Sequence, residues 1–153
     1  MRLINNFLLG SIGNNAYLIE TNGKIVLIDA PENVIEIIDY AKKKNLIIDY
    51  VFLTHGHYDH ILGLDLIVEH FPDIKIVMSK DEKMCLTDIN ENLSFYTEKP
   101  YTYEGEVLTF DDINLDDFGV RIEYITGHSK ASAVFVFEED KEVFSGDTLF
   151  ARS

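Results

Sequence analysis

The sequence predicts one α/β domain in which sheets and helices are layered, and three observations support this class. Short β-branched and apolar runs fill the first and last thirds of the chain, strand and helix patterns alternate in the middle, and two helix patterns each carry one apolar stripe. The chain has 153 residues, 46% hydrophobic and 26% charged, which is ordinary for a globular protein with one core. With no repeat, low-complexity segment or linker, residues 1–153 are predicted to form a single domain.

The first third of the chain is predicted to form three strands, at residues 2–9, 16–20 and 24–29. Asn22-Gly23 between the second and third runs is a strong signal for a tight hairpin. Pro31 then opens a helix. Its buried stripe consists of Val34, Ile37, Ile38 and Ala41.

The middle of the chain alternates strands and helices. Residues 46–54 form a nearly continuous apolar run, which predicts a strand buried on both faces. Pro72 ends a second helix, whose stripe consists of Leu64, Ile67, Val68 and Phe71. Further predictions are strands at 74–78, 101–110, 120–126, 131–137 and 141–144, a helix at 80–88, and a loop over the site at 90–100.

The segment Thr54 to Gly63, THGHYDHILG, places three histidines and one aspartate within six positions. Imidazole and carboxylate are ligands that suit zinc, iron and similar divalent metals. Residues two apart in an extended loop point the same way, so His55, His57 and Asp59 can face one cavity, and His60 joins them if a helix begins there. A surface loop that became rich in histidine by drift is the alternative. The histidine segment lies between a strand pattern and a helix pattern, and this position favours a metal site.

Two later segments supply further ligand candidates, His128 and Asp147, each in a glycine-containing turn after a strand pattern. HGHYDH, TGHS and SGDTLF, in this order, resemble the HxHxDH, TPGHT-type and GDTLF segments of the metallo-β-lactamase-fold hydrolases, within them the glyoxalase II-like branch. The resemblance covers essentially the whole chain. It implies an αββα sandwich with the metals at one edge of its two sheets.

The resemblance also implies two divalent metal ions, zinc first and iron or manganese otherwise. It implies His55, His57 and His128 as ligands of the first ion, Asp59 and His60 as ligands of the second, and Asp147 as the bridge. A hydroxide held by the metals would attack a thioester or related carbonyl, with Asp59 as the catalytic residue that orients it and takes its proton. A thiolate leaves without a proton, which makes a thioester a natural substrate.

Two other functions stay open. One is an iron oxygenase resembling the family's persulfide dioxygenase branch, with a single iron at the positions of His55, His128 and Asp147. The other is an inactive fragment, because the sequence stops six residues after Asp147, where family members continue through further strands, helices and a last histidine ligand. We expect a truncated chain whose uncovered surface favours a homodimer. The family's proline is also absent before Gly127, and no cysteine stands at the later ligand positions, unlike in true β-lactamases that use one.

Charge and composition exclude several partners. The formal net charge is −14, from 27 acidic and 13 basic residues, which argues against nucleic acid and anionic membranes as partners. The N-terminal apolar stretch is too short, and too interrupted by polar residues, for a signal peptide or a spanning helix, so we expect the protein in the cytoplasm. The glycosylation sequon at Asn92 means little in that compartment. Cys85 is the single cysteine and is interpreted as a packed thiol. The partner is a small-molecule substrate.

The substrate itself is not defined by the sequence. Residues 95–103, FYTEKPYTY, could line a pocket in which Lys99 meets an anionic group, although packing of these aromatics on the core is favoured. Nothing supports glutathione specificity, because the helical domain that helps bind glutathione in glyoxalase II has no counterpart here. There is no GxSxG elbow, and Ser129 is interpreted as a small loop residue.

Overall fold

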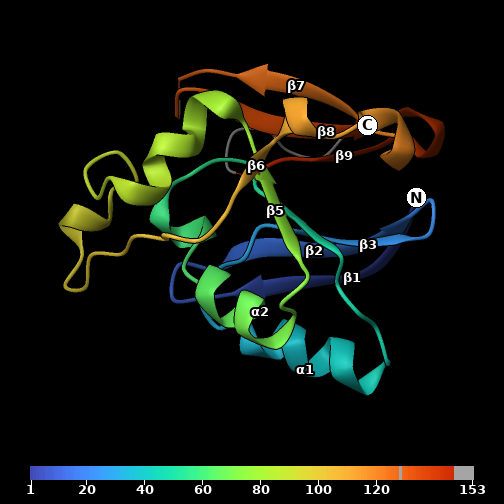
Figure 1. Cartoon of the computed structure of the whole chain (residues 1–153), viewed down its shortest axis with the longest axis horizontal. Coiled ribbons are helices and arrows are strands. Elements are labelled where there is room, and N and C mark those ends of the chain that lie inside the picture. Colours follow the sequence, from blue (N-terminus) through green and yellow to red (C-terminus); the bar gives the residue numbers. More distant parts are fainter. Residues whose placement is uncertain (128, 147–153) are drawn as a thin grey trace.

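The computed structural model describes residues 1–127 and 129–146 and shows two stacked sheets with helices on one outer side (Figure 1). The strands are β1 (Arg2–Leu9), β2 (Asn14–Thr21), β3 (Lys24–Ile28), β4 (Tyr50–Phe52), β5 (Lys75–Met78), β6 (Leu108–Thr109), β7 (Arg121–Ile125), β8 (Ser132–Phe137) and β9 (Glu142–Phe144). The α-helices are α1 (Ile35–Lys43) and α2 (Leu64–His70). Six short 3₁₀ segments are η1 (Tyr58–His60), η2 (Lys80–Thr87), η3 (Ser94–Tyr96), η4 (Phe110–Asp112), η5 (Leu115–Phe118) and η6 (Glu138–Asp140).

The larger sheet has six strands in the order β1-β2-β3-β4-β5-β6. Its first three strands are antiparallel, and β3 to β6 run parallel. The predicted hairpin between β2 and β3 is confirmed. Asn22 and Gly23 have φ of 48° and 80°, the left-handed conformation that a tight two-residue turn requires.

The smaller sheet consists of β7, β8 and β9, all antiparallel. It lies against one face of the six-stranded sheet, and α1 and α2 lie against the other (Figure 1). In the described part of the chain these two are the α-helices, so the layers present are helix, sheet, sheet. This is the predicted α/β metallo-β-lactamase arrangement over its first three layers.

The first helix stripe was predicted correctly, and the second is correct except at Val68, which is only half-buried. Val34, Ile37, Ile38 and Ala41 of the first stripe are all buried, with no more than 1% exposure. The helix itself begins at Ile35, one turn after Pro31, because residues 32–34 form a turn. Leu64 and Ile67 anchor α2 in the same core.

A second core fills the space between the two sheets and is rich in aromatic residues. Phe52 is fully buried at its centre, and its ring centroid lies 5.1–5.5 Å from those of Phe110, Phe118 and Phe135. These rings come from β4, two 3₁₀ segments and β8. Such packing, worth about 0.5–1.5 kcal/mol per aromatic pair beyond area burial, joins the sheets directly behind the loop that follows β4.

Three predicted elements were wrong in extent or type. The strand predicted at 46–54 is only Tyr50–Phe52, because the chain before it has no regular structure although Ile48 is buried in the core. The strand predicted at 101–110 is only Leu108–Thr109. In this segment Tyr103 is buried, but it lies in a loop, and its amide bonds to the carbonyl of Leu86. The alternating apolar pattern therefore reflected side-chain packing and not pairing with a neighbouring strand.

The helix predicted at 80–88 is the 3₁₀ segment η2. Ser79 caps it by accepting a hydrogen bond from the amide of Asp81, and the amide of Glu82 bonds back to the carbonyl of Ser79. In the described ranges, no helix is long and apolar enough to cross a membrane.

Candidate metal centre

The histidine loop begins where β4 ends, at the carboxyl edge of the parallel strands. Leu53 still bonds to β5, through its amide and the carbonyl of Val77 at 2.9 Å. The chain then leaves the sheet, and His57 is extended (φ −68°, ψ 147°) before the turn of η1 carries Asp59 and His60. The local structure therefore has the extended-then-helical form that the sequence pattern predicted for this segment.

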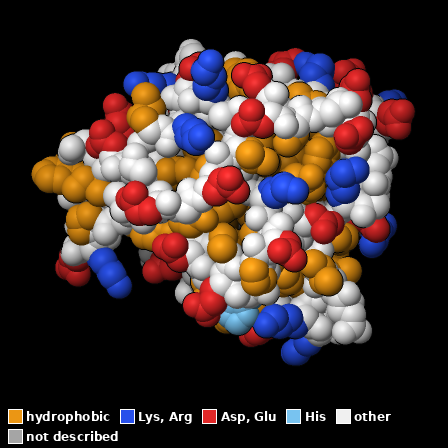
Figure 2. All heavy atoms as spheres, in the orientation of Figure 1, with side chains coloured by type: hydrophobic (Ala, Val, Ile, Leu, Met, Phe, Trp, Pro, Cys, Tyr) orange, Lys and Arg blue, Asp and Glu red, His pale blue; other side chains and the backbone are white. Residues whose placement is uncertain are grey.

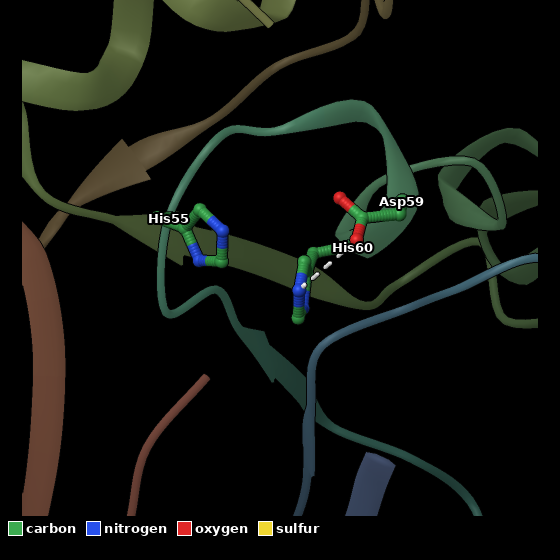
Figure 3. A group of neighbouring side chains, drawn as sticks. All are labelled: His55, Asp59 and His60. Atoms are coloured by element: carbon green, nitrogen blue, oxygen red, sulfur yellow. Dashed lines mark ion pairs between the residues drawn. The ribbon is translucent and has the colours of Figure 1, made fainter. Parts of the chain in front are cut away.

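The structure brings the four predicted residues of this loop together. The ring of His55 lies with its centroid 4.7 Å from that of His57 and 4.3 Å from that of His60. Ligand atoms of His55, Asp59 and His60 all lie within 4.8 Å of one another, and the three side chains converge on one space (Figure 3). All three histidines are buried, whereas the Asp59 side chain is 17% exposed. This donor set fits a divalent metal at the rim of the fold.

Asp29, which sequence analysis missed, is the buried anchor of this cluster. It directly follows β3, is 1% exposed and has a left-handed backbone (φ 68°). Its Oδ1 accepts the amide of Thr54 at 2.8 Å. Its Oδ2 lies 2.8 Å from both the Thr54 hydroxyl and Nδ1 of His60. The sequence does show an aspartate at the end of the strand that neighbours β4, but a single aspartate in that position is too common to count as a motif.

These hydrogen bonds assign the tautomers of two histidines. A carboxylate can only accept, so Nδ1 of His60 carries the proton that it donates to Asp29. The hydroxyl of Thr54 gives its single hydrogen to Asp29, so it accepts from Nδ1 of His55, which lies 3.0 Å away. In the neutral form of both rings Nε2 is therefore the lone-pair nitrogen, as a metal ligand requires.

Asp59 is held from the other side by Asn14, the first residue of β2. The Asn14 amide group donates to the Asp59 carbonyl at 3.0 Å and to Oδ2 at 3.2 Å. The same Oδ2 lies 3.6 Å from Nε2 of His60, the pair joined by the dashed line in Figure 3. With the His60 tautomer assigned above, two electron-pair donors face each other there, an arrangement that a cation between them stabilises.

His128 and Asp147 lie outside the described residues. The neighbouring Gly146 packs against the centre, because a Cβ on it would lie 2.7 Å from Oγ1 of Thr54 and 3.1 Å from the His55 ring. A side chain larger than hydrogen at position 146 would collide with the ligand loop.

A cavity of about 490 Å³ opens beside the centre. Its lining includes His57 and Cys85, and the other residues come from the 90–93 and 126–130 segments. Phe95 and Tyr96 of the 95–103 segment are 54% and 79% exposed, so the favoured packing on the core is wrong for these two, and apolar side chains gather on this projecting segment (Figure 2). Tyr103 packs into the core as the favoured interpretation held. Lys99 lines a different cavity, of about 440 Å³, with Tyr101.

Two further predictions concern residues behind the loop. Burial raises the pKa of the Cys85 thiol to about 12, and the carboxylate of Glu82 adds to the effect, so Cys85 is a packed thiol. Asn92 is fully buried, and its side-chain amide donates to the carbonyls of Cys85 and Tyr101. The sequon asparagine is thus a structural residue in the folded chain.

Comparison with known proteins identifies relatives of this chain. Residues 9–153 match the family model described as metallo-beta-lactamase superfamily. The probable metallo-hydrolase YqgX of Bacillus subtilis is 31% identical, over 93% of this chain and 69% of its own length. A hydroxyacylglutathione hydrolase of Francisella tularensis subsp. holarctica is 28% identical, over 94% of this chain and 50% of its own length.

Solved structures show the same fold. The BLEG-1 B3 metallo-beta-lactamase superposes with a TM-score of 0.83 at 28% identity, covering 95% of this chain and 72% of that one. TTHA1623, in a di-iron-bound form, superposes with a TM-score of 0.78 at 27% identity, covering 98% and 75%. The chain spans 62% of a probable metallo-hydrolase of Streptococcus pyogenes and half of the Francisella enzyme.

Proposed function

The chain belongs to the metallo-beta-lactamase superfamily, and on that premise we propose that it is a metal-dependent hydrolase of a thioester or a related carbonyl compound. The observation that carries the proposal is the convergence of His55, Asp59 and His60, with both imidazoles presenting Nε2. A purely structural cluster would not need two histidine tautomers set by one buried carboxylate. We propose two divalent ions, with zinc, iron or manganese as candidates, and TTHA1623 in its di-iron-bound form supports iron among them.

The residues present fit such ions. His55 and His60 would hold them through Nε2, His57 stands beside His55, and Asp59 offers a carboxylate oxygen. His128 and Asp147 complete the proposed ligand set by their place in the sequence. When bound, divalent ions lower the pKa of a coordinated water from 15.7 to about 7 and polarise a carbonyl oxygen.

Asp59 is the proposed catalytic residue of this chain. Asn14 holds its carboxylate in place, and its partial exposure leaves it accessible to solvent. From there it would orient the attacking water and accept its proton. Asp29 lies deeper, where it fixes His60 and Thr54, so its role is to position the ligands.

A thioester is the proposed substrate class because its thiolate leaves without needing a proton. The relatives named hydroxyacylglutathione hydrolase support this class, although the chain spans only half the length of the one compared above. The cavity beside His57 is large enough for a small acyl group and part of its thiol carrier.

Hydrolysis of a panel of small acyl thioesters tests the proposal. We expect turnover by the zinc-, manganese- or iron-loaded protein, loss of turnover with a chelator, and a fall of about 10²-fold or more in kcat for D59N. H70A is the control, because His70 lies on α2 and bonds to Lys42, outside the cluster. Turnover that persists in H55A and after chelation would contradict a metal-dependent mechanism. The dioxygenase function would replace the hydrolase function if the protein consumed oxygen with a persulfide, held one iron per chain and hydrolysed none of the thioesters.

A further inference from the structure

Glu82 is a fully buried carboxylate in a chain with a net charge of −14, and the proposed reaction does not use it. It lies in η2, just after β5. Its Oε1 accepts the amide of Gly56 at 2.9 Å, and its Oε2 accepts the amide of Ala131 at 2.7 Å. A buried carboxylate is costly unless hydrogen bonds satisfy it, so these two backbone donors account for its presence in the interior.

The two amides lie in segments that are attached to different sheets. Gly56 stands between His55 and His57 in the loop after β4 of the six-stranded sheet. Ala131 directly precedes β8 of the three-stranded sheet and ends the segment that follows β7. A second bond joins the same two regions, from the amide of Ala133 to the carbonyl of Thr54 at 2.6 Å.

The sequence places predicted ligands on both sides of this link. His55 and His57 flank one amide, and position 128 precedes the other by three residues. The backbone on each side of Gly56 sets the direction in which the Cα–Cβ bonds of His55 and His57 leave the chain, so a carboxylate that holds this amide helps to fix both directions. Metal affinity depends on such outer contacts, and their loss commonly costs about 10–100-fold.

We propose that Glu82 is a positioning residue of the metal centre, which bridges the ligand loop and Ala131 through its two oxygens and so holds the backbone between His55 and His57 in its metal-binding form before any metal arrives. The inference rests on the proposed function of the site. It adds a connection between the two sheets that neither the histidine motif nor Asp29 supplies.

The substitution E82Q separates this role from simple space filling. Glutamine has the same shape, but one of its two polar atoms is an NH₂ group that would face a backbone N–H. It can therefore accept from Gly56 or from Ala131 but not from both. E98Q is the matched control, because it removes the same charge from an exposed side chain.

Titration of the metal-free protein with Co²⁺, followed by its visible absorption, measures affinity and coordination together. We expect E82Q to bind Co²⁺ about 10-fold or more weakly, with an altered absorption spectrum, while E98Q matches the wild type. Amide hydrogen exchange of the metal-free proteins is the second readout. Exchange should accelerate at Gly56, at Ala131 or at both in E82Q, with unchanged protection in the core strands.

The outcomes separate the inference from the proposed function. Wild-type affinity and spectrum in E82Q would overturn the role of Glu82 even if the protein is a metal-dependent hydrolase. Failure of the wild type to bind Co²⁺, Zn²⁺ or Fe²⁺ would overturn the proposed function, and with it a role of Glu82 in metal binding, whereas the exchange data would still decide whether Glu82 bridges the two segments. If E82Q does not fold, E82D replaces it. Its carboxylate is one methylene too short to reach both amides, so unchanged Co²⁺ affinity in E82D would equally refute the inference.

Discussion

The buried side chain of Asp29 makes the contacts that prepare two histidines for metal binding. It accepts from the Thr54 amide and hydroxyl and from Nδ1 of His60, and through Thr54 it also sets the proton of His55. Three donors on two carboxylate oxygens leave no room for an amide group in the same position. Its left-handed φ of 68° is one that asparagine adopts as readily as aspartate.

We therefore predict that D29N lowers Zn²⁺ affinity by about 10–100-fold without changing the backbone. The asparagine NH₂ must face at least one of the three donors, which displaces Thr54 or forces His60 into the tautomer that blocks Nε2. Competition with a chromophoric chelator measures the affinity. D73N, an exposed aspartate substitution, should behave like the wild type, and equal affinity in D29N would refute the assigned tautomers.

Cys85 gives a prediction for alkaline pH. Its pKa is raised from 9.0 to about 12 by burial in the folded chain, so the unfolded chain releases the thiol proton first. Its contribution to stability is therefore fully present below pH 9.0 and is lost progressively as pH rises toward about 12. The free energy of unfolding should fall less steeply in C85A over this window. In the folded protein at pH 8, alkylation of Cys85 should be slow and should accelerate on addition of denaturant.

At the scale of elements, η2 packs against the ligand loop more closely than a side chain on Gly56 would allow. A Cβ at position 56 would lie 2.4 Å from Cβ of Cys85 and 3.1 Å from its Sγ. This contact, together with the Glu82 bridge, holds the loop between His55 and His57 against η2. Only glycine fits at this position, for reasons of space rather than backbone angle.

The substitution G56A should accordingly destabilise the protein by about 1–3 kcal/mol, because it overpacks the interface between η2 and the loop. Thermal unfolding of the metal-free protein measures the effect. C85G should partly restore stability in the G56A background, since it removes the clashing Cβ, whereas C85A keeps that atom and should not. Equal rescue by both would show that the clash is relieved elsewhere.

Periodic elements were predictable from the sequence, and irregular ones were not. The strands of β1 to β3, the stripe of α1 and the strands of β7 to β9 each have a pattern that repeats along the chain. The segment at 101–110 was mistaken for a strand because Tyr101 and Tyr103 alternate in the sequence, whereas their amides bond to the Ser94 hydroxyl and the Leu86 carbonyl and form no ladder. In η2, the residues Lys80 to Lys83 look like a solvated charged face, and only Glu82 among them is buried.

At the scale of the whole molecule, the candidate centre lies at the edge where the two sheets meet. Its described residues come from the start of β2, the residue that follows β3 and the loop after β4, and Glu82 of η2 bonds to that loop. The motif predicted which residues share the centre because they are close in sequence. Asn14, Asp29 and Glu82 reach it from distant elements, so only the folded chain reveals them.

A metal bound at this edge should stabilise the whole fold, because it binds the folded chain and not the unfolded one. At a free Zn²⁺ concentration of 100 times Kd, the gain is about 2.7 kcal/mol. For a domain of this size we expect Tm to rise by about 5–10 °C. Differential scanning calorimetry with and without a chelator measures it. An unchanged Tm in zinc-loaded protein would exclude preferential binding to the folded chain.

Metal content per chain decides whether this loop forms a metal centre, and plasma mass spectrometry on protein expressed without added metal measures it. A metal-dependent hydrolase with a centre built on His55, Asp59 and His60 predicts close to two equivalents of zinc, iron or manganese per chain, and a clear loss in H55A. Substoichiometric metal in the wild type, or the same content in H55A as in the wild type, would contradict the account.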